Sequence, residues 1–275
     1  MVTVNIKYLK YGSTRDEVVY IPKNIDNARE QNLGTWQDVG FECVKHQSNV
    51  TDWEKGLIEY RQELADWALL ATGADCTLSV ENFKRSSDPT SNLTPIYNAH
   101  CDFKKTYLAE IKEFASIIRF NTLPPDIRKA HKESFDINTS LSSFRTFLIL
   151  QFWRNIGDIN PDCQMAWCDN NTITHKCLVS ASLDRQENSI HQGYGGENSI
   201  EHSVTVLQSN DTNDHKWYYY PELQHDEMVV FKAYDSSALF GNKWLSPHAA
   251  FNHPDITIGN PYRHSVEGRV FCLFF

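Results

Sequence analysis

The sequence lacks several features that mark common protein classes. No apolar run approaches the roughly 20 residues of a membrane-spanning helix, and residues 1–7 alternate like a strand, without the apolar stretch of a signal peptide. Basic residues are in the minority, with 26 Lys and Arg against 35 Asp and Glu, which argues against a phosphate track or an anionic membrane surface. We therefore expect a cytoplasmic protein that binds neither nucleic acid nor a membrane.

Paired cysteines and a convincing nucleotide loop are also missing. The 7 cysteines are scattered, without a Cys-x-x-Cys pair, so they are expected to be free thiols and not a zinc site or a disulfide framework. Gly193-Tyr194-Gly195-Gly196 follows no clear strand and opens no helix, so it is not expected to cradle a phosphate.

Two segments of the first half have helical periodicity. Thr51–Glu54 resembles a capping box, and apolar residues then recur at helical spacing as far as Gly73. A second helical pattern covers Leu108–Ile118 and ends before Pro124. We expect helical support mainly over residues 51–135.

From about residue 144 the pattern changes to short apolar or alternating runs separated by turn residues. These runs are 147–153, 176–181, 203–207, 217–220, 228–234, 248–251 and 270–275. Helices followed by many short strands fit a double-sheet jelly roll better than an alternating βαβ fold. We expect one mainly β domain over residues 1–275 with flanking α-helices, a cupin-like double-stranded β-helix whose strands lie mainly at 97–102 and 144–275.

A candidate metal site starts at the strand end that carries His100 and Asp102. Two residues apart on a strand, their side chains point to the same face. A mononuclear Fe(II) oxygenase needs two histidines and one carboxylate on one side of the metal, and His248, in an apolar run near the C-terminus, is the best third ligand. The alternative is a His-x-Asp pair that only hydrogen-bonds within a turn.

A second group of polar residues follows His248. Arg263, Ser265, Glu267 and Arg269 share one face if this segment is extended. The distal carboxylate of 2-oxoglutarate needs a planar bidentate donor, which Arg263 supplies, with the Ser265 hydroxyl as a further partner. Arg269 has two alternatives, either to bind the same co-substrate or to form a structural ion pair with Glu267.

Several segments together resemble a known family. They include residues 39–44, the helix that carries Tyr60 and Glu63, His100-Cys101-Asp102, residues 152–156 and 165–169, and the stretch 217–251. In these the sequence resembles the fungal AsaB-type hydroxylase/desaturase family, related to CmcJ-like proteins. The resemblance covers most of the chain.

The resemblance implies a jelly-roll oxygenase that uses Fe(II) and 2-oxoglutarate, with His100, Asp102 and His248 as the metal ligands. It further implies O2 and a small-molecule substrate, often from secondary metabolism, with hydroxylation, desaturation and ring closure all open. Arg154 is expected either to bind a carboxylate of co-substrate or substrate, or to be a structural arginine that pairs with Asp169 or Glu222.

Two other functions are alternatives to the oxygenase. One is a metal-free jelly roll that only binds a ligand, and the other is a methyltransferase, which the missing glycine-rich strand-to-helix loop argues against. The oligomeric state is open, a homodimer included.

Overall fold

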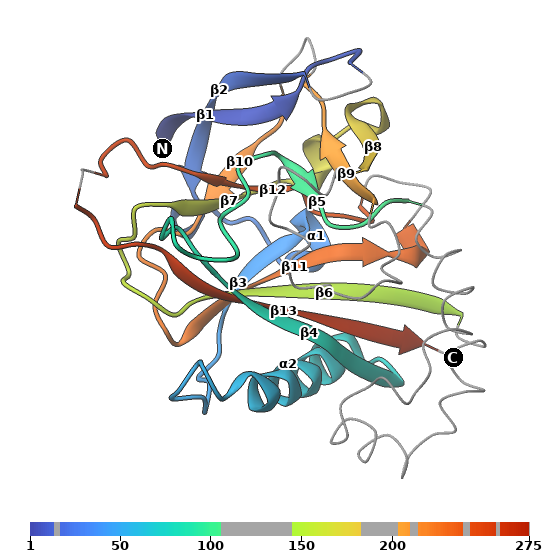
Figure 1. Cartoon of the computed structure of the whole chain (residues 1–275). Coiled ribbons are helices and arrows are strands. Elements are labelled where there is room, and N and C mark those ends of the chain that lie inside the picture. Colours follow the sequence, from blue (N-terminus) through green and yellow to red (C-terminus); the bar gives the residue numbers. More distant parts are fainter. Residues whose placement is uncertain are drawn as a thin grey trace.

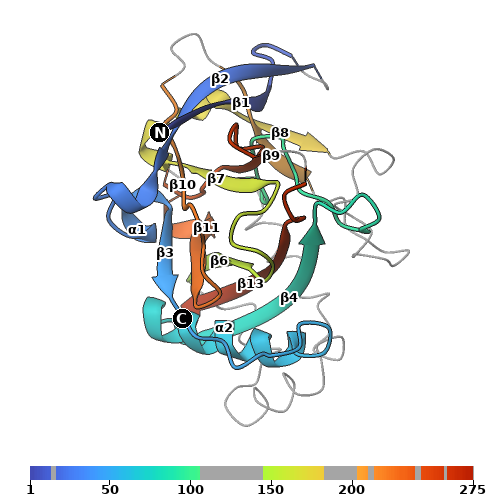
Figure 2. The ribbon, with the colours of Figure 1, turned by 90° about the vertical axis from the view of Figure 1, so that its left-hand side faces the viewer.

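The computed structural model describes residues 1–13, 17–105, 145–182, 203–209, 214–238, 243–256 and 259–274. Within these ranges the strands form two sheets, one of eight strands and one of five, which lie one above the other (Figures 1 and 2). The predicted mainly β, double-sheet jelly-roll architecture is confirmed.

The eight-stranded sheet is antiparallel except where β10 runs parallel to β2. In spatial order it contains β1 (Val2–Leu9), β2 (Val18–Asn27), β10 (Trp217–Tyr219), β7 (Gln164–Cys168), β12 (His248–Phe251), β5 (His100–Cys101), β9 (Ser203–Leu207) and β8 (Leu178–Ser182). Bridges from Lys7 to Asn98 and from Leu9 to Gln208 also bring β1 to the β5 and β9 side. The sheet therefore curls back towards itself, around a core that includes Ile6 and Ala249.

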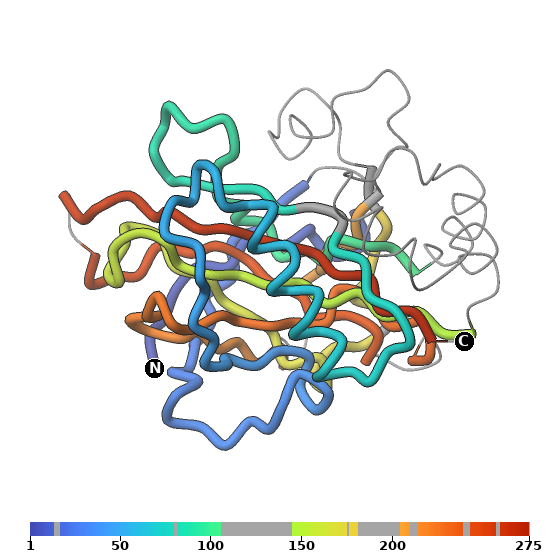
Figure 3. The backbone as a smooth tube through the Cα atoms, turned by 90° about the horizontal axis from the view of Figure 1, so that it is seen from below, coloured from blue at the N-terminus to red at the C-terminus, as the bar shows by residue number. Residues whose placement is uncertain are grey.

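The five-stranded sheet is wholly antiparallel. In spatial order it contains β3 (Phe41–Lys45), β11 (Glu227–Asp235), β6 (Thr146–Asn155), β13 (His264–Phe274) and β4 (Cys76–Ser86). The helix α2 (Leu57–Thr72) lies across its outer face (Figure 3). The short helices are α1 (Trp36–Val39) and the 3-10 turns Ala28–Glu30, Asn170–Thr172, His175–Cys177 and Ser236–Ala238.

The two faces of β13 carry different residues, and this alternation positions the site. Val266 packs with the core under α2, and Gly268 lies so close to Leu64 of α2 that a Cβ atom there would clash with it. Ser265 and Glu267, one position out of phase, point between the two sheets. One strand thus supplies both an apolar contact to the helix and a polar wall to the interior.

The strands predicted in the second half are confirmed. β9 and β12 have the predicted bounds, and the others differ by a few residues, except that β13 begins at His264 instead of residue 270. The pattern does not predict β4, because Cys76–Ser86 is largely polar in the second half and lies where helical support is expected. The second helical pattern, Leu108–Ile118, lies outside the described residues, as does Gly193–Gly196.

The first predicted helix exists but starts later than the pattern indicates. Asp52 accepts backbone hydrogen bonds from Lys55 and Gly56 and caps Glu54 with its side chain, so this segment is a turn. The helix begins only at Leu57 and ends, as predicted, at Gly73, which has the left-handed conformation that favours glycine.

The predicted free thiols are confirmed, since all seven cysteines are unpaired and six of them are buried. In the part of the chain that the structure describes, no helix combines the length and the apolar character needed to cross a membrane.

Candidate metal centre

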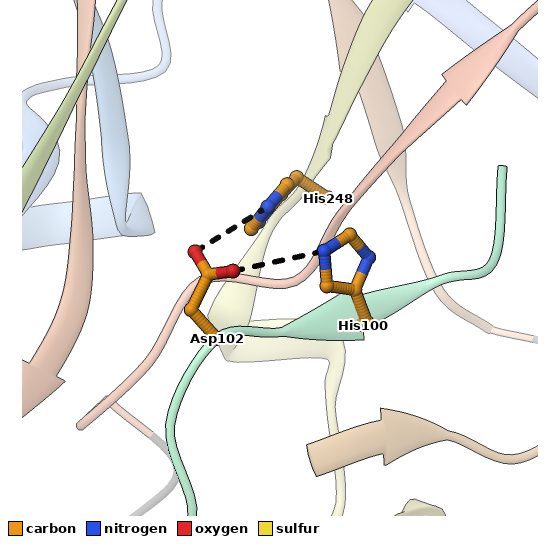
Figure 4. Close-up of side chains that lie close together, drawn as sticks. All are labelled: His100, Asp102 and His248. Carbon is orange, nitrogen blue, oxygen red and sulfur yellow. Dashed lines mark ion pairs between the residues drawn. The ribbon is translucent and has the colours of Figure 1, made fainter. Parts of the chain in front are cut away.

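Three side chains converge between the two sheets. Nε2 of His100 lies 3.8 Å from Oδ1 of Asp102, and Nε2 of His248 lies 3.7 Å from Oδ2 of the same carboxylate (Figure 4). One ligand atom from each residue lies within 4.8 Å of the other two. The structure thus brings together the three residues predicted as metal ligands, although they are up to 148 positions apart (248 − 100).

Sheet pairing explains why the three residues meet. β12 pairs with β5 antiparallel, with His248 directly opposite His100, and the two rings lie 4.4 Å apart between centroids. Side chains opposite one another on neighbouring strands project to the same face. Asp102 follows His100 by two residues, just beyond the end of β5, and its side chain turns back to this face.

The hydrogen bonds of the two imidazoles leave the inner nitrogens for a metal. Nδ1 of His100 lies 2.7 Å from the carbonyl oxygen of Asn98, and Nδ1 of His248 lies 3.2 Å from that of Ser246. A carbonyl only accepts, so Nδ1 carries the proton and each Nε2 has a lone pair. Nε2 of His100 and Oδ2 of Asp102 are both buried and have no hydrogen-bond partner among the described residues, as expected of metal ligands.

The surroundings hold these groups in the protonation states that a metal requires. Burial, followed by the neighbouring His248, lowers the pKa of His100 to about 4, and burial also lowers the pKa of His248. Burial alone would raise the pKa of Asp102, but Arg269 and the two histidines outweigh it and lower the pKa to about 2. At neutral pH the site therefore contains two neutral imidazoles and one carboxylate.

Arg263 lines the same pocket just before β13 begins, and the buried Ser265 follows it by two residues on that strand. Arg263 lines the pocket with the triad, is 1% exposed, and has its backbone N–H held by Asp162. Its Nε and the hydroxyl of Ser265 have no hydrogen-bond partner, and its guanidinium lies 5.6 Å from the ring of Trp153. Nη1 of Arg263 donates to Sγ of Cys163, at 3.8 Å, but no carboxylate among the described residues pairs with the guanidinium. Such a guanidinium, with a free hydroxyl close by in the sequence, fits the carboxylate of a ligand.

Arg269 pairs with Asp102 and not with Glu267, the structural partner predicted for it. Its Nη2 lies 3.2 Å from Oδ1 of Asp102, and its predicted ion pair with Glu267 is wrong. Glu267 instead pairs with Arg85, at 3.1 Å. Arg85 on β4 lies opposite Ser265, so it reaches Glu267 diagonally across the strands, whereas Glu267 and Arg269 are separated along one strand.

Arg154 is not part of the pocket. It follows Trp153 on β6, so the two side chains leave opposite faces of the sheet. Its guanidinium donates to Oη of Tyr60 at 3.2 Å, to Nδ1 of His46 at 2.6 Å and to the carbonyl of His225. Arg154 is thus a structural arginine between β6 and α2, and Asp169 and Glu222 are not the partners that hold it.

Two polar residues that the sequence pattern did not indicate also line the pocket, Arg85 and Gln151. Gln151 carried a signal, because it is the only polar residue in the apolar run 147–153. Arg85 had none, since only its register against β13 places it in the interior.

Three further histidines lie away from the triad. Nε2 of His253 lies 3.3 Å from Oη of Tyr219, Nε2 of His225 lies 2.6 Å from the carbonyl of Gly157, and His264 is exposed. His202 lies outside the described residues.

Comparison with known proteins places the chain in a family. Residues 10–273 match the family described as "Oxidoreductase/YMDC permease-like domain". The chain belongs to this oxidoreductase family. The match covers almost the whole chain, including the triad, Arg263 and Ser265.

Curated relatives of this family member are fungal enzymes. The chain is 24% identical to "Alpha-ketoglutarate-dependent dioxygenase phiK" of Fungal sp., over 94% of this chain and 88% of the relative. It is 23% identical to "Hydroxylase/desaturase efuI" of Hormonema carpetanum, over 98% and 88% respectively. The resemblance predicted from the sequence, to fungal hydroxylase/desaturase proteins, is confirmed.

A solved structure has the same fold. The iron and alpha-ketoglutarate-dependent endoperoxidase NvfI superimposes with a TM-score of 0.71 at 20% identity, covering 100% of this chain and 96% of that chain. A relative named nvfI comes from Aspergillus novofumigatus. The likeness extends over the whole chain, so both sheets belong to the shared architecture.

Proposed function

We propose that the protein is an Fe(II)- and 2-oxoglutarate-dependent oxygenase that acts on a small molecule with O2, as a hydroxylase or desaturase of secondary metabolism. One observation carries the proposal. A buried triad of two histidines and one carboxylate shares a pocket with Arg263, a buried arginine that has no carboxylate partner among the described residues. The names of the fungal relatives support the same chemistry.

His100, Asp102 and His248 would hold the iron, and they would do so from one side. Three protein ligands of this kind leave further coordination positions open for co-substrate and oxygen. Bound iron would supply the oxidising chemistry, coupled to oxidative decarboxylation of 2-oxoglutarate to succinate. The protein's own contribution is to fix the ligands, through the carbonyls of Asn98 and Ser246, and to keep the site dry.

Arg263 and Ser265 would hold the distal carboxylate of 2-oxoglutarate. The guanidinium presents a planar fork that matches a carboxylate, and Ser265 can donate its hydroxyl proton to one of the same oxygens. Trp153 lies against the guanidinium and limits its movement. The co-substrate would thus be fixed at one end by Arg263 and directed at the metal with its other end.

The alternatives account less well for the geometry. A metal-free binding protein gains nothing from leaving Nε2 of His100 and Oδ2 of Asp102 buried without partners, which costs free energy. A methyltransferase predicts a nucleotide-type cofactor loop, whereas the described core consists of two largely antiparallel sheets.

Anaerobic titration of the metal-free protein with Fe(II) and 2-oxoglutarate tests the proposal. A chelated complex has a weak visible charge-transfer band, and we expect it in the wild type. His100→Ala and His248→Ala should abolish the band, because each removes a ligand. His253→Ala is the matched control and should keep it, since His253 contacts Tyr219 outside the triad. A wild-type protein without the band would refute the proposal.

A further inference from the structure

The two oxygens of Asp102 have different surroundings. Oδ1 lies 3.2 Å from Nη2 of Arg269, whereas Oδ2 is buried and no described residue forms a hydrogen bond with it. The side chain of Asp102 is 9% exposed, so water contributes little at either atom. One oxygen is therefore engaged by a guanidinium and the other is left for a ligand.

Arg269 is itself held in a fixed orientation. Its Nε donates to Oε1 of Gln151 at 3.3 Å, from the directly opposite position on β6. Its guanidinium carbon lies 5.5 Å from the ring of Phe83 and 5.4 Å from that of Phe103. Two aromatic rings and an amide thus restrict a side chain that is only 13% exposed.

A local irregularity accompanies this placement. The register between β13 and β4 shifts between Arg269 and Val270. Irregularities of this kind bend a strand and re-aim a side chain. Arg269 lies at the shift and leans to Asp102, while Glu267, before it, keeps the regular register and pairs with Arg85.

We propose that Arg269 is a positioning residue that holds Oδ1 of Asp102, so that the carboxylate gives the metal one oxygen, Oδ2, instead of two. The proposal deepens the oxygenase function and rests on it. A carboxylate that bound through both oxygens would occupy an additional coordination position. A six-coordinate iron with one atom from each of the three protein ligands and two atoms from 2-oxoglutarate keeps one coordination position for O2. A second oxygen of Asp102 would occupy that last position.

This role separates Arg269 from Arg263, the residue that the sequence favours for the co-substrate and for which Arg269 is the alternative. Arg263 lines the pocket and its Nε has no partner, whereas Arg269 contacts a metal-ligand candidate and Gln151. Arg263 is therefore suited to bind a ligand, and Arg269 to orient Asp102. Loss of each should affect a different binding step.

The test uses the whole protein, loaded anaerobically with Fe(II) and 2-oxoglutarate and titrated with nitric oxide, an O2 surrogate that gives an EPR signal on binding. In Arg269→Met we expect nitric oxide affinity to fall about 10-fold or more, and Fe(II) affinity to fall by about 10- to 100-fold, the usual range when a residue that orients a ligand is lost. Arg269→Lys should lie in between, because an ammonium can reach Oδ1 but lacks the second bond to Gln151.

The control is Arg29→Met, which also removes an arginine from a buried carboxylate, Glu227, at the start of β11. It should keep wild-type affinity for Fe(II) and nitric oxide, and circular dichroism reports whether each variant folds. If Arg269→Met binds nitric oxide with wild-type affinity, the proposal is wrong, whatever the iron affinity of the variant. If Arg269→Met does not fold, the same criterion applies to Arg269→Lys. If the wild type itself binds no iron, the oxygenase function fails and this inference with it.

Discussion

Replacement of Arg263 by Met should separate binding of the co-substrate from binding of the metal. The guanidinium is 1% exposed and its Nε lacks a partner, so a bound carboxylate would gain a fully desolvated charge pair. Truncating one side of such a pair costs about 2–5 kcal/mol, which raises Kd about 30-fold to several thousandfold. Fe(II) affinity should stay within about twofold, since Arg263 contacts none of the triad.

Two milder variants give a graded series. Arg263→Lys keeps the charge but loses the bidentate fork, and bonds to charged groups are worth about 1.5–3 kcal/mol, so Kd should rise roughly 10- to 150-fold. Ser265→Ala removes one hydroxyl, at a cost of about 1 kcal/mol or about fivefold in Kd. The order Ser265→Ala, Arg263→Lys, Arg263→Met follows from the number of hydrogen bonds and charges lost.

Arg263→Met should weaken the binding of 2-oxoglutarate without lowering the stability of the ligand-free protein, which thermal unfolding measures. Arg263 has no ion-pair partner in the part of the chain that the structure describes, so Arg263→Met should leave the stability of the metal-free, ligand-free protein unchanged or raise it. With 2-oxoglutarate at about 100 times its wild-type Kd, binding stabilises the wild type by about 2.7 kcal/mol, and this gain should fall to about 0.9 kcal/mol or less in the variant. Calorimetry measures Kd and differential scanning fluorimetry measures the shift. An unchanged Kd for 2-oxoglutarate in Arg263→Met would refute the role assigned to Arg263.

Two further predictions concern residues outside the pocket. Arg154→Met should destabilise the fold by about 1–3 kcal/mol for each buried acceptor that it leaves unpaired, while the protein that remains folded keeps its affinity for 2-oxoglutarate. Urea unfolding and calorimetry check this, and weaker binding with normal stability would contradict it. Burial alone would raise the pKa of Glu227, but Arg29 and the backbone amide of Gln224 outweigh it and lower the pKa to about 2. The ion pair between Glu227 and Arg29 therefore stabilises the protein fully above the ordinary pKa of about 4.5, and this stabilisation is lost as the pH falls towards 2. Glu227→Gln should therefore lose stability at pH 7 but little at pH 2.5, and an equal loss at both pH values would contradict this.

The parts of the site that could be predicted are those in which short-range geometry decides. His100 and Asp102 are two positions apart at a strand end, and Arg263 and Ser265 are two apart in an extended segment, so the alternation of strand side chains places each pair on one face. The prediction of His248 as a ligand depended only on its apolar run being a strand. The second-half strands were predictable for the same reason, since their apolar pattern is strong.

The parts that could not be predicted depend on which strands are neighbours. Whether Trp153 or Arg154 faces the interior depends on which side of β6 is covered by α2, and the sequence of β6 is apolar on both. Arg85 enters the pocket only because β4 pairs with β13, a contact across about 180 positions (265 − 85). The start of α2 was misplaced because Asp52 satisfies backbone donors in a turn as well as it would in a first helical turn.

The charges inside the pocket give the strongest argument for an anionic ligand. Asp102 is matched by Arg269, and Glu267 by Arg85, so these four residues contribute no net charge. Among the described residues no carboxylate pairs with Arg263, which remains as a buried cation, and a ferrous ion at the triad would add two further positive charges. Burying such an excess is costly unless negative charge accompanies it. A dianion that spans from Arg263 to the metal supplies that charge, whereas a neutral ligand would leave the positive charge without compensation. A keto-diacid therefore fits the pocket better than a neutral molecule of the same size.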